Sequence, residues 1–185
     1  MSPAAPTIVG KILAVHHSLD AGDLPHAFGG ALALAWCTQR ARGTIDIDVN
    51  VFVEQARSSE IFDALPSEMS RSDDDLARCL QDGQVRLWWD NTPVDVFTNT
   101  TEFHATVADR AVTHEFAGTS VPFLGCTDLA VFKAFFDRPR DWVDLSEMLE
   151  AGSLAPELAL GVLARYLGVD DHRVARLQEL IVDEG

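Results

Sequence analysis

The most regular alternation of apolar and polar residues in the chain runs over Thr44–Val53 (TIDIDVNVFV). Isoleucine or valine occupies every odd-numbered position of this segment, and Thr44, Asp46, Asp48 and Asn50 lie between them. A period of two is typical of a β-strand with one apolar face. We therefore predict a strand over Thr44–Val53 whose polar face carries two aspartates.

Shorter apolar runs predict the remaining strands. Val85–Trp89 and Pro93–Thr98 flank the turn-forming residues Asp90–Thr92, which is typical of two strands joined by a turn. Leu24–Phe28 is a short apolar stretch that ends at Gly29-Gly30, directly before a segment rich in alanine and leucine. The glycine pair is therefore predicted to lie at a strand-to-helix junction.

Helical spacing of apolar residues dominates the rest of the chain. The predicted helices are Pro6–Asp20, Ala31–Gln39, Ser58–Ala64, Asp73–Gln81, Asp128–Phe136, Trp142–Leu149, Pro156–Leu167 and His172–Val182. Gly43 is suited to the C-cap of the second helix. The order of elements predicts an α+β fold: residues 1–124 form a core with a mixed β-sheet, and residues 125–185 form a C-terminal helical region packed on it.

The composition fits one globular unit with a small helical part. The chain has 185 residues, of which 47% are hydrophobic and 23% charged, so it can bury a substantial core. Since no stretch approaches the ~20 apolar residues that a membrane span needs, no membrane association is expected. The N-terminal segment has no pattern of a secretory signal, and the cytoplasm is the expected location.

The three cysteines, Cys37, Cys79 and Cys126, are widely spaced and form no C-x-x-C pair. An odd number of separated cysteines indicates neither a disulfide framework nor a zinc site. We expect all three to be reduced residues that pack in the interior.

The net charge of −15 limits the range of partners. The chain has two lysines and twelve arginines against 29 acidic residues. A protein that grips a long nucleic-acid duplex usually presents a basic face, so extended contact with nucleic acid is not expected. A small local basic strip, or a basic protein partner, remains compatible with this composition.

Asp46 and Asp48 are two positions apart on one predicted strand, so both carboxylates point to the same side, roughly 7 Å apart at the backbone. Two carboxylates directed at one point repel each other unless a cation lies between them. Mg²⁺ prefers such oxygen ligands and commonly shares them with substrate phosphates. The alternative is that this polar face is the solvent-exposed side of an edge strand, where acidic residues are common.

Two more features favour the metal site. Asp95 lies between Val94 and Val96 on another predicted strand, with no salt-bridge partner evident in the sequence. A third carboxylate converging on the first two is what two-metal phosphoryl transfer requires. Gly29-Gly30, at the start of a helix, offers backbone N–H groups that can bind phosphate, although a glycine pair can equally be a simple turn.

The order of these motifs resembles the DNA polymerase β-type nucleotidyltransferase superfamily and, more narrowly, the AbiEii/MenT group of toxin nucleotidyltransferases. The resemblance rests on four motifs between Leu24 and Leu149: the glycine start (Gly29-Gly30-Ala31-Leu32), the segment Arg42-Gly43-Thr44-Ile45-Asp46-Ile47-Asp48, Lys133 on a helix, and Arg138-Pro139-Arg140-Asp141-Trp142-Val143-Asp144. It implies a polymerase β-like core with a C-terminal helical bundle.

The resemblance also implies roles for single residues. Asp46, Asp48 and Asp95 would bind Mg²⁺ or Mn²⁺, while Gly29, Gly30, Thr44 and Lys133 would bind the nucleotide. Arg42, Asp141 and Asp144 would support the site, the two aspartates by orienting Lys133. Lys133 also has a simpler explanation, since a single lysine on an apolar helix often extends to solvent.

The implied activity is transfer of a nucleoside monophosphate from an NTP to the 3′ end of tRNA, which blocks translation. The chain would be the toxin of a bacterial toxin–antitoxin pair, and its partner would be a cognate antitoxin. In the MenT-like group that antitoxin can be a kinase that phosphorylates the hydroxyl equivalent to Thr44. Two alternatives stay open: an enzyme that nucleotidylates a small molecule or a protein hydroxyl, and a non-catalytic, antitoxin-like binding module.

Overall fold

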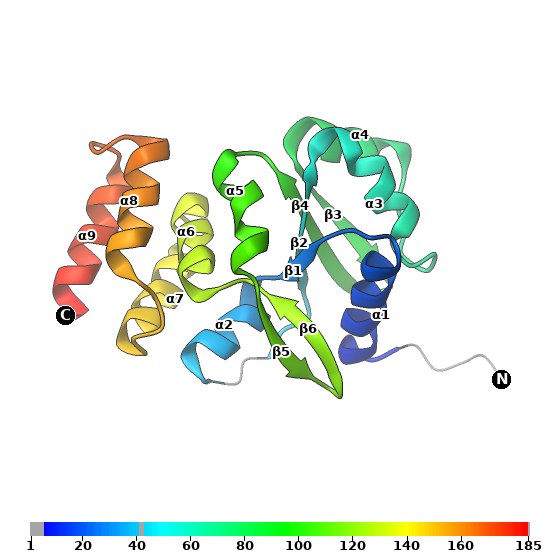
Figure 1. The fold of residues 1–185 in the computed structure, drawn as a ribbon, viewed down its shortest axis with the longest axis horizontal. Helices are drawn as coiled ribbons and strands as arrows, with labels where there is room; N and C mark the ends of the chain where they lie inside the picture. Colours follow the sequence, from blue (N-terminus) through cyan, green and yellow to red (C-terminus); the bar gives the residue numbers. More distant parts are fainter. Residues whose placement is uncertain (1–5, 41–42, 185) are drawn as a thin grey trace. The chain divides into compact units, whose positions relative to one another are not determined.

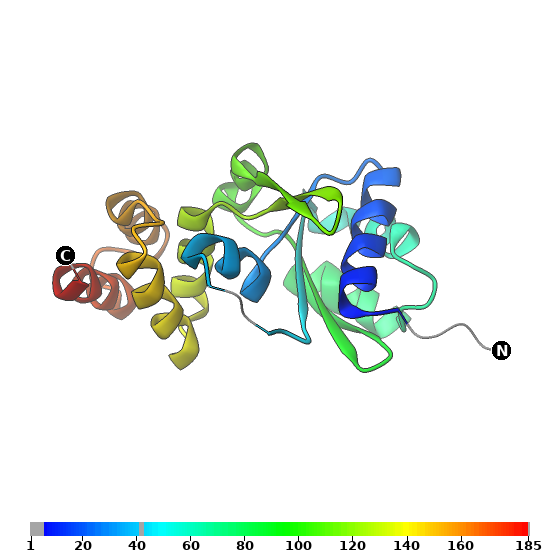
Figure 2. The same cartoon turned by 90° about the horizontal axis from the view of Figure 1, so that it is seen from below.

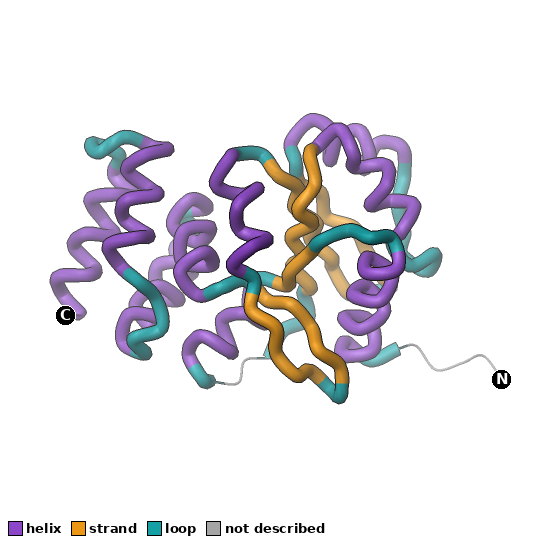
Figure 3. The backbone as a smooth tube through the Cα atoms, in the orientation of Figure 1, coloured by secondary structure: helices purple, strands orange, loops and turns teal. Residues whose placement is uncertain are grey.

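The computed structural model describes residues 6–40 and 43–184. The chain forms two compact units. One comprises Met1–Gly29 and Gly43–Phe123 and is called the sheet unit below; the other comprises Gly30–Arg42 and Leu124–Gly185 and is called the helical unit. Strands occur in the sheet unit, and the described part of the helical unit consists of helices and loops, as the colours of Figure 3 show.

The sheet unit is built on a six-stranded mixed sheet in the order β3-β4-β2-β1-β6-β5. Its strands are β1 (His26–Phe28), β2 (Ile47–Glu54), β3 (Gln84–Trp89), β4 (Thr92–Asn99), β5 (Val112–Phe116) and β6 (Thr119–Phe123). The pairs β2–β4 and β1–β6 are parallel, and the other three pairs are antiparallel. The predicted α+β fold with a mixed sheet is confirmed.

Helices cover both faces of the central strands. They are α1 (Ile8–Ala21), α3 (Ser58–Ala64), α4 (Asp73–Asp82) and α5 (Glu102–Val107), with short 3₁₀ turns η1 (Gln55–Arg57) and η2 (Ala108–Arg110). Figure 1 shows α1, α3 and α4 on one side of β2 and β4, and α5 on the other. The side chains of Thr7 and Ser72 cap the N-termini of α1 and α4 by accepting backbone hydrogen bonds.

Strand β2 is buried on both faces along most of its length. Ile47, Val49 and Val51 are fully buried on one face. On the other face Asn50 faces α5, where its Oδ1 lies 3.1 Å from the Nε2 atom of His104. Asp48 is on this second face, nearer the start of the strand, and stays partly exposed. The polar face of the strand is therefore covered by α5 at one end and carries the aspartate at the other.

Lys11 fixes α1 to the turn between β3 and β4, which lie beside it in Figure 2. Its buried ammonium donates hydrogen bonds to the carbonyl of Trp89 at 2.7 Å, to Thr92 Oγ1 at 3.1 Å and to Asp90 Oδ2 at 3.2 Å. Asp90 has φ +52°, a left-handed conformation that aspartate tolerates in turns. One of the two lysines of the chain is thus used to hold the sheet unit together.

The helical unit consists of α2 (Gly30–Thr38), α6 (Cys126–Phe136), α7 (Pro139–Glu150), α8 (Pro156–Leu167) and α9 (His172–Glu184). Helix α6 packs against α2, α7 and α8. Helices α2, α7, α8 and α9 of this unit also contribute large, fully buried side chains, among them Leu34, Leu145, Met148, Leu163 and Leu177. The predicted helical C-terminal region is therefore present, with α2 added to it.

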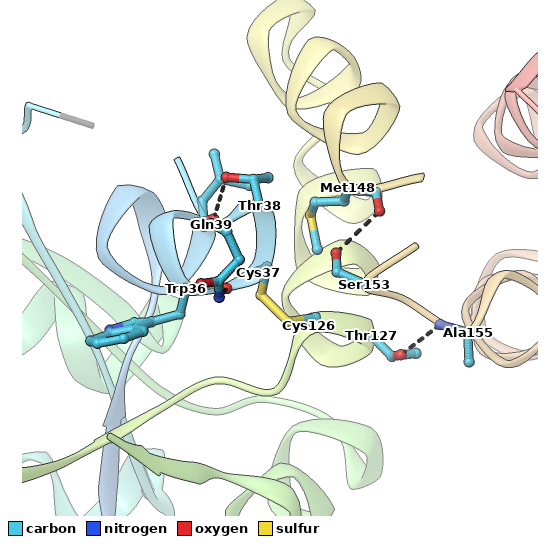
Figure 4. Close-up of a disulfide and its surroundings, with 10 residues drawn as sticks. Trp36, Cys37, Thr38, Gln39, Cys126, Thr127, Met148, Ser153 and Ala155 are labelled. Carbon is cyan, nitrogen blue, oxygen red and sulfur yellow. Dashed lines mark hydrogen bonds between the residues drawn. A yellow bond between two sulfur atoms is a disulfide. The ribbon is translucent and has the colours of Figure 1, made fainter. Parts of the chain in front are cut away.

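Cys37 of α2 and Cys126 of α6 form a disulfide with a Cα–Cα distance of 5.6 Å (Figure 4). The expectation of three reduced cysteines is therefore wrong for this pair. The packing of α2 on α6 brings together two cysteines that are 89 positions apart, a proximity that spacing alone does not reveal. Cys79 is free and buried, as expected.

Other differences from the prediction have local causes. Strand β2 begins at Ile47 instead of Thr44, and Ile45 is 72% exposed. Helix α2 ends at Thr38, and Gln39 has φ +55°, so the helix stops well before the predicted cap at Gly43. The hairpin β5–β6 and helix α5 were not predicted; strand β5 lacks a buried face and therefore a clear apolar alternation. No helix in the described part of the chain has the length and apolarity needed to cross a bilayer.

The predicted boundary after residue 124 lies within one residue of the observed one, but the grouping of residues 30–42 differs from the prediction. The predicted core of residues 1–124 included the segment that forms α2, whereas the structure groups residues 30–42 with the helical unit. Helix α2 contacts α6 and α7, and the disulfide joins it to α6. The helical unit is therefore assembled from two segments that are distant in the sequence.

Burial of His104 predicts an acid-sensitive fold. Burial lowers its pKa from 6.5 to about 4, so the folded state disfavours the charged imidazole that the unfolded chain accepts. The contribution of neutral His104 to the free energy of unfolding should be fully present above pH 6.5 and should fall as the pH is lowered toward 4. At pH 5 the loss due to His104 should be about 2 kcal/mol. Urea unfolding at pH 7.5 and pH 5 should show a smaller difference for His104→Gln than for the wild type. An unchanged difference would contradict this role.

Candidate active site

The three predicted carboxylates belong to the sheet unit, where Asp48 and Asp95 lie on the paired parallel strands β2 and β4 and Asp46 lies directly before β2. Asp48 of β2 is directly opposite Asp95 of β4 in the parallel register, so the two side chains share one face of the sheet. Asp46 directly precedes the first residue of β2. All three are partly exposed. Asp46, Asp48 and Asp95 are called the carboxylate cluster below.

Arg86 of β3 forms an ion pair with this cluster. It lies directly opposite Asp95 in the antiparallel β3–β4 pair. Its Nε donates to Asp95 Oδ1 at 2.8 Å and its Nη2 to Oδ2 at 2.6 Å, a bidentate arrangement. The expectation that Asp95 has no salt-bridge partner is therefore wrong, because strand pairing supplies one.

The electrostatics of Arg86 show that it is close to the whole cluster. The hydrogen bonds to Asp95 raise the pKa of the guanidinium above its ordinary value, against the opposing effect of burial. The charges of Asp95, Asp46 and Asp48 raise it further. Arg86 is thus a cation that contacts Asp95 and interacts electrostatically with Asp46 and Asp48, the other two carboxylates predicted to bind metal.

The chemistry of the carboxylate cluster fits a divalent cation, since Mg²⁺ and Mn²⁺ bind carboxylate oxygens. The side chains are not gathered as a ready set of ligands: within residues 6–40 and 43–184 no group of three or more His, Cys, Asp or Glu side chains is close enough to hold a metal ion. Arg86 holds Asp95 in the present arrangement. A cation would bind here only with a change in the contact between these two residues.

The glycine pair lies where the chain passes from β1 to α2. The N–H of Gly29 donates to the carbonyl of Asp48 at 2.9 Å, which extends the pairing of β1 with β2. Gly30 begins α2 with φ +52°, a conformation that favours glycine. Because the Gly29 amide is used within the sheet, it does not offer its N–H group to phosphate in this arrangement; the phosphate contact of Gly30 stays a prediction.

Thr44 precedes β2 and makes a local turn. Its hydroxyl accepts a hydrogen bond from the backbone N–H of Asp46 and donates one to the carbonyl of the same residue, both at 3.1 Å. The hydroxyl therefore orders the backbone that carries Asp46. The prediction that it points from a strand into the site is replaced by this role. Arg42, predicted to support the site, lies outside the described residues.

The helical unit brings Lys133, Asp141 and Asp144 together. The ammonium of Lys133 lies 2.6 Å from Asp144 Oδ2 and 3.5 Å from Asp141 Oδ1. Asp141 also accepts a hydrogen bond from Arg138 Nε at 2.7 Å. Lys133 is only 6% exposed, so it does not extend to solvent from the apolar helix. The two aspartates that were predicted to orient Lys133 do contact it.

Comparison with solved structures places this arrangement in a known fold. The chain is similar to the antibiotic-resistance factor ANT(2″)-Ia, with a TM-score of 0.52 and 15% identity, over 95% of this chain and 89% of that one. This is a nucleotidyltransferase fold. An antigenic nucleotidyltransferase-like protein from Paracoccidioides brasiliensis is similar with a TM-score of 0.48 and 13% identity, over 90% of this chain and 92% of that one.

Similarity at this level of identity establishes the nucleotidyltransferase fold and no finer relationship. No protein-family model matches the sequence, and comparison with curated protein sequences gave no match. The resemblance to the AbiEii/MenT group therefore stays a prediction. Sequence reasoning did not find Arg86, although the signal was present: the short turn after Trp89 sets the hairpin register that places Arg86 opposite Asp95.

Proposed function

We propose that this chain is a metal-dependent nucleotidyltransferase that moves a nucleoside monophosphate from an NTP to an acceptor hydroxyl. The observation that carries the proposal is the parallel register that places Asp48 opposite Asp95, with Asp46 directly before the strand that carries Asp48. In a nucleotidyltransferase fold, two carboxylates on one face of neighbouring strands and a third directly before one of these strands suit a phosphoryl-transfer site.

In the proposed reaction, the acceptor oxygen attacks the α-phosphorus of the NTP. A new phosphorus–oxygen bond forms, the bond between the α-phosphorus and its bridging oxygen breaks, and pyrophosphate leaves. The hydroxyl proton passes to a carboxylate oxygen of Asp95. From the resemblance, Gly30 would bind phosphate through its backbone N–H group; Lys133, another nucleotide-binding residue that the resemblance gives, is paired with Asp141 and Asp144 in the helical unit.

Asp46, Asp48 and Asp95 would hold Mg²⁺, for which Mn²⁺ can substitute. When bound, the metal would neutralise phosphate charge and make the acceptor hydroxyl easier to deprotonate. Asp48 and Asp95 are held in position by the paired strands that carry them, and the turn made by Thr44 fixes the backbone of Asp46. Two of the three carboxylates are thus held by paired strands, and the third by a hydrogen-bonded turn.

The proposed acceptor is the 3′ end of tRNA, and the proposed biological role is the toxin of a toxin–antitoxin pair. The ordered set of motifs from the glycine pair to Asp144 supports this proposal. The proposed partner is a cognate antitoxin protein, and if it is a kinase, Thr44 is its target. Phosphate on Thr44 would add nearly two negative charges next to Asp46 and remove the hydroxyl from its contacts with the backbone.

A second candidate acceptor is a cationic small molecule that carries a hydroxyl group. The net charge of −15 favours it, since an acidic surface attracts a cation and repels RNA. The similar structure with the TM-score of 0.52 is an antibiotic-resistance factor, which is compatible with a small-molecule acceptor. The NTP would be the donor for either acceptor, tRNA or small molecule.

Incubation of the protein with each α-labelled NTP, Mg²⁺ and either total tRNA or a panel of aminated, hydroxylated small molecules tests the proposal. We expect label at the tRNA 3′ end, loss of labelling with a chelator, and reduced labelling by Thr44→Glu. Label in a small molecule instead would identify the second acceptor. If no acceptor is labelled and no NTP binds in the presence of Mg²⁺, the chain is a non-catalytic binding module and the proposal is wrong.

A further inference from the structure

The pairing of β3 with β4 places Arg86 beside Asp95, and the two side chains differ in their exposure to solvent. The Arg86 side chain is 51% exposed, whereas that of Asp95 is 18% exposed. Strand β3 is at the edge of the sheet, and Gln84 and Arg86 occupy its exposed positions while Val85 and Leu87 face the core. The guanidinium can therefore move into solvent while the carboxylate stays in place.

The carboxylate cluster requires a counter-cation. Carboxylates that lie close together on and beside two neighbouring strands repel one another when no cation is near. Arg86 supplies this charge through a bidentate contact with Asp95 and lies close enough to Asp46 and Asp48 to interact with their charges. A partly exposed ion pair is only modestly stable. A divalent cation that contacts several carboxylates at once can therefore replace it.

A guanidinium that leaves its carboxylate can bind another anionic group. Arginine binds phosphate in the same bidentate geometry in which it binds carboxylate. A metal–nucleotide complex would bring both the cation that competes with Arg86 for Asp95 and the phosphate oxygens that Arg86 can bind. The released Arg86 would then be beside phosphate oxygens, and its positive charge would stabilise the bound triphosphate.

We propose that Arg86 exchanges partners during substrate loading: it neutralises Asp95 while no metal is bound, and contacts the triphosphate when a metal–nucleotide complex takes Asp95. This inference rests on the proposed nucleotidyltransferase function and adds a positioning residue to it. Its consequence is that the metal ion alone binds weakly and the metal–nucleotide complex binds well, so the site does not fill with metal before substrate arrives.

The test measures the affinity for Mn²⁺, and for a non-hydrolysable NTP in the presence of Mn²⁺, for the wild type, Arg86→Gln and Arg86→Lys. Arg86→Gln should bind Mn²⁺ alone about fivefold more tightly, and the nucleotide about fivefold more weakly, than the wild type. These opposite changes are not expected of a residue that only stabilises the fold.

Arg86→Lys is the matched control, because it keeps the positive charge and removes the guanidinium group that binds two oxygens at once. If only charge matters, it should behave like the wild type in both measurements. Partner exchange predicts that it also binds Mn²⁺ more tightly, since an ammonium cannot hold both oxygens of Asp95. The Nε–H signal of Arg86 in ¹⁵N spectra, assigned by its loss in the lysine variant, should shift when Mg²⁺ and the NTP analogue are added.

The outcomes separate this inference from the proposed function. Failure of the wild type and both variants to bind Mn²⁺ would remove the metal site and the proposed function with it. Mn²⁺ binding that is abolished by Asp46→Asn but is the same in all three Arg86 forms would keep the proposed function and overturn the exchange. Wild-type behaviour of Arg86→Lys together with an unmoved Nε–H signal would also overturn it.

Discussion

Asp46→Asn should abolish nucleotide transfer and leave the fold intact. The replacement removes one negative charge from the carboxylate cluster and weakens its hold on a divalent cation. Loss of one preorganised electrostatic contact commonly costs roughly 10²–10³ in rate, and loss of a metal ligand should cost on the order of 10³-fold or more. The measurement is the initial rate of labelled-NTP transfer, alongside circular dichroism and thermal unfolding of the same samples.

Asp63→Asn is the control for that experiment, because it makes the same change of charge at an exposed position on α3 in the same unit. It should keep the wild-type rate. Thermal stability of Asp46→Asn should match the wild type or exceed it, since the replacement relieves repulsion within the cluster. A rate within tenfold of the wild type would refute the role assigned to Asp46.

Lys133→Met should strongly destabilise the helical unit. Lys133 is buried, and so are its partners Asp141 and Asp144. Asp141 keeps its contacts with Arg138, but Asp144 loses an ammonium that lies 2.6 Å away. Removal of one partner from a buried ion pair takes the closest counter-charge from the remaining group and costs about 3–5 kcal/mol. Urea unfolding at neutral pH measures this loss.

The double variant Lys133→Met/Asp144→Leu distinguishes the cause. It removes both members of the closest pair, so no buried carboxylate remains at position 144, and it should recover most of the lost stability. If the single variant is as stable as the wild type, the buried contact is not structural. If the double variant is no more stable than the single one, the loss comes from packing instead of charge.

Elements with local signals were predicted well. Helix α8 has proline at its first position and ends at Gly168, and its predicted bounds, Pro156–Leu167, agree with the structure. Proline suits the first turn of a helix and glycine the residue after its end. Strand β2 was found by its alternation, but its start was placed three residues early, because Thr44, Ile45 and Asp46 continue the pattern in sequence without pairing in the sheet.

Long-range features were not predictable in the same way. The strand order and the parallel register of Asp48 with Asp95 depend on which strands become neighbours. The disulfide depends on the packing of α2 against α6. Arg86 is an intermediate case: the hairpin turn fixes its position opposite Asp95, and pairing the two predicted strands through that turn would have identified it.

The covalent link between Cys37 and Cys126 turns the intervening chain into a ring that contains β2, β3, β4, β5 and β6. Tension applied to the two termini passes through the sulfur atoms and bypasses that ring. The 89-residue separation corresponds to about 300 Å of extended chain, and single molecules pulled from both ends should release this length only after reduction. A protease that cuts once inside the ring would likewise leave a single covalent particle.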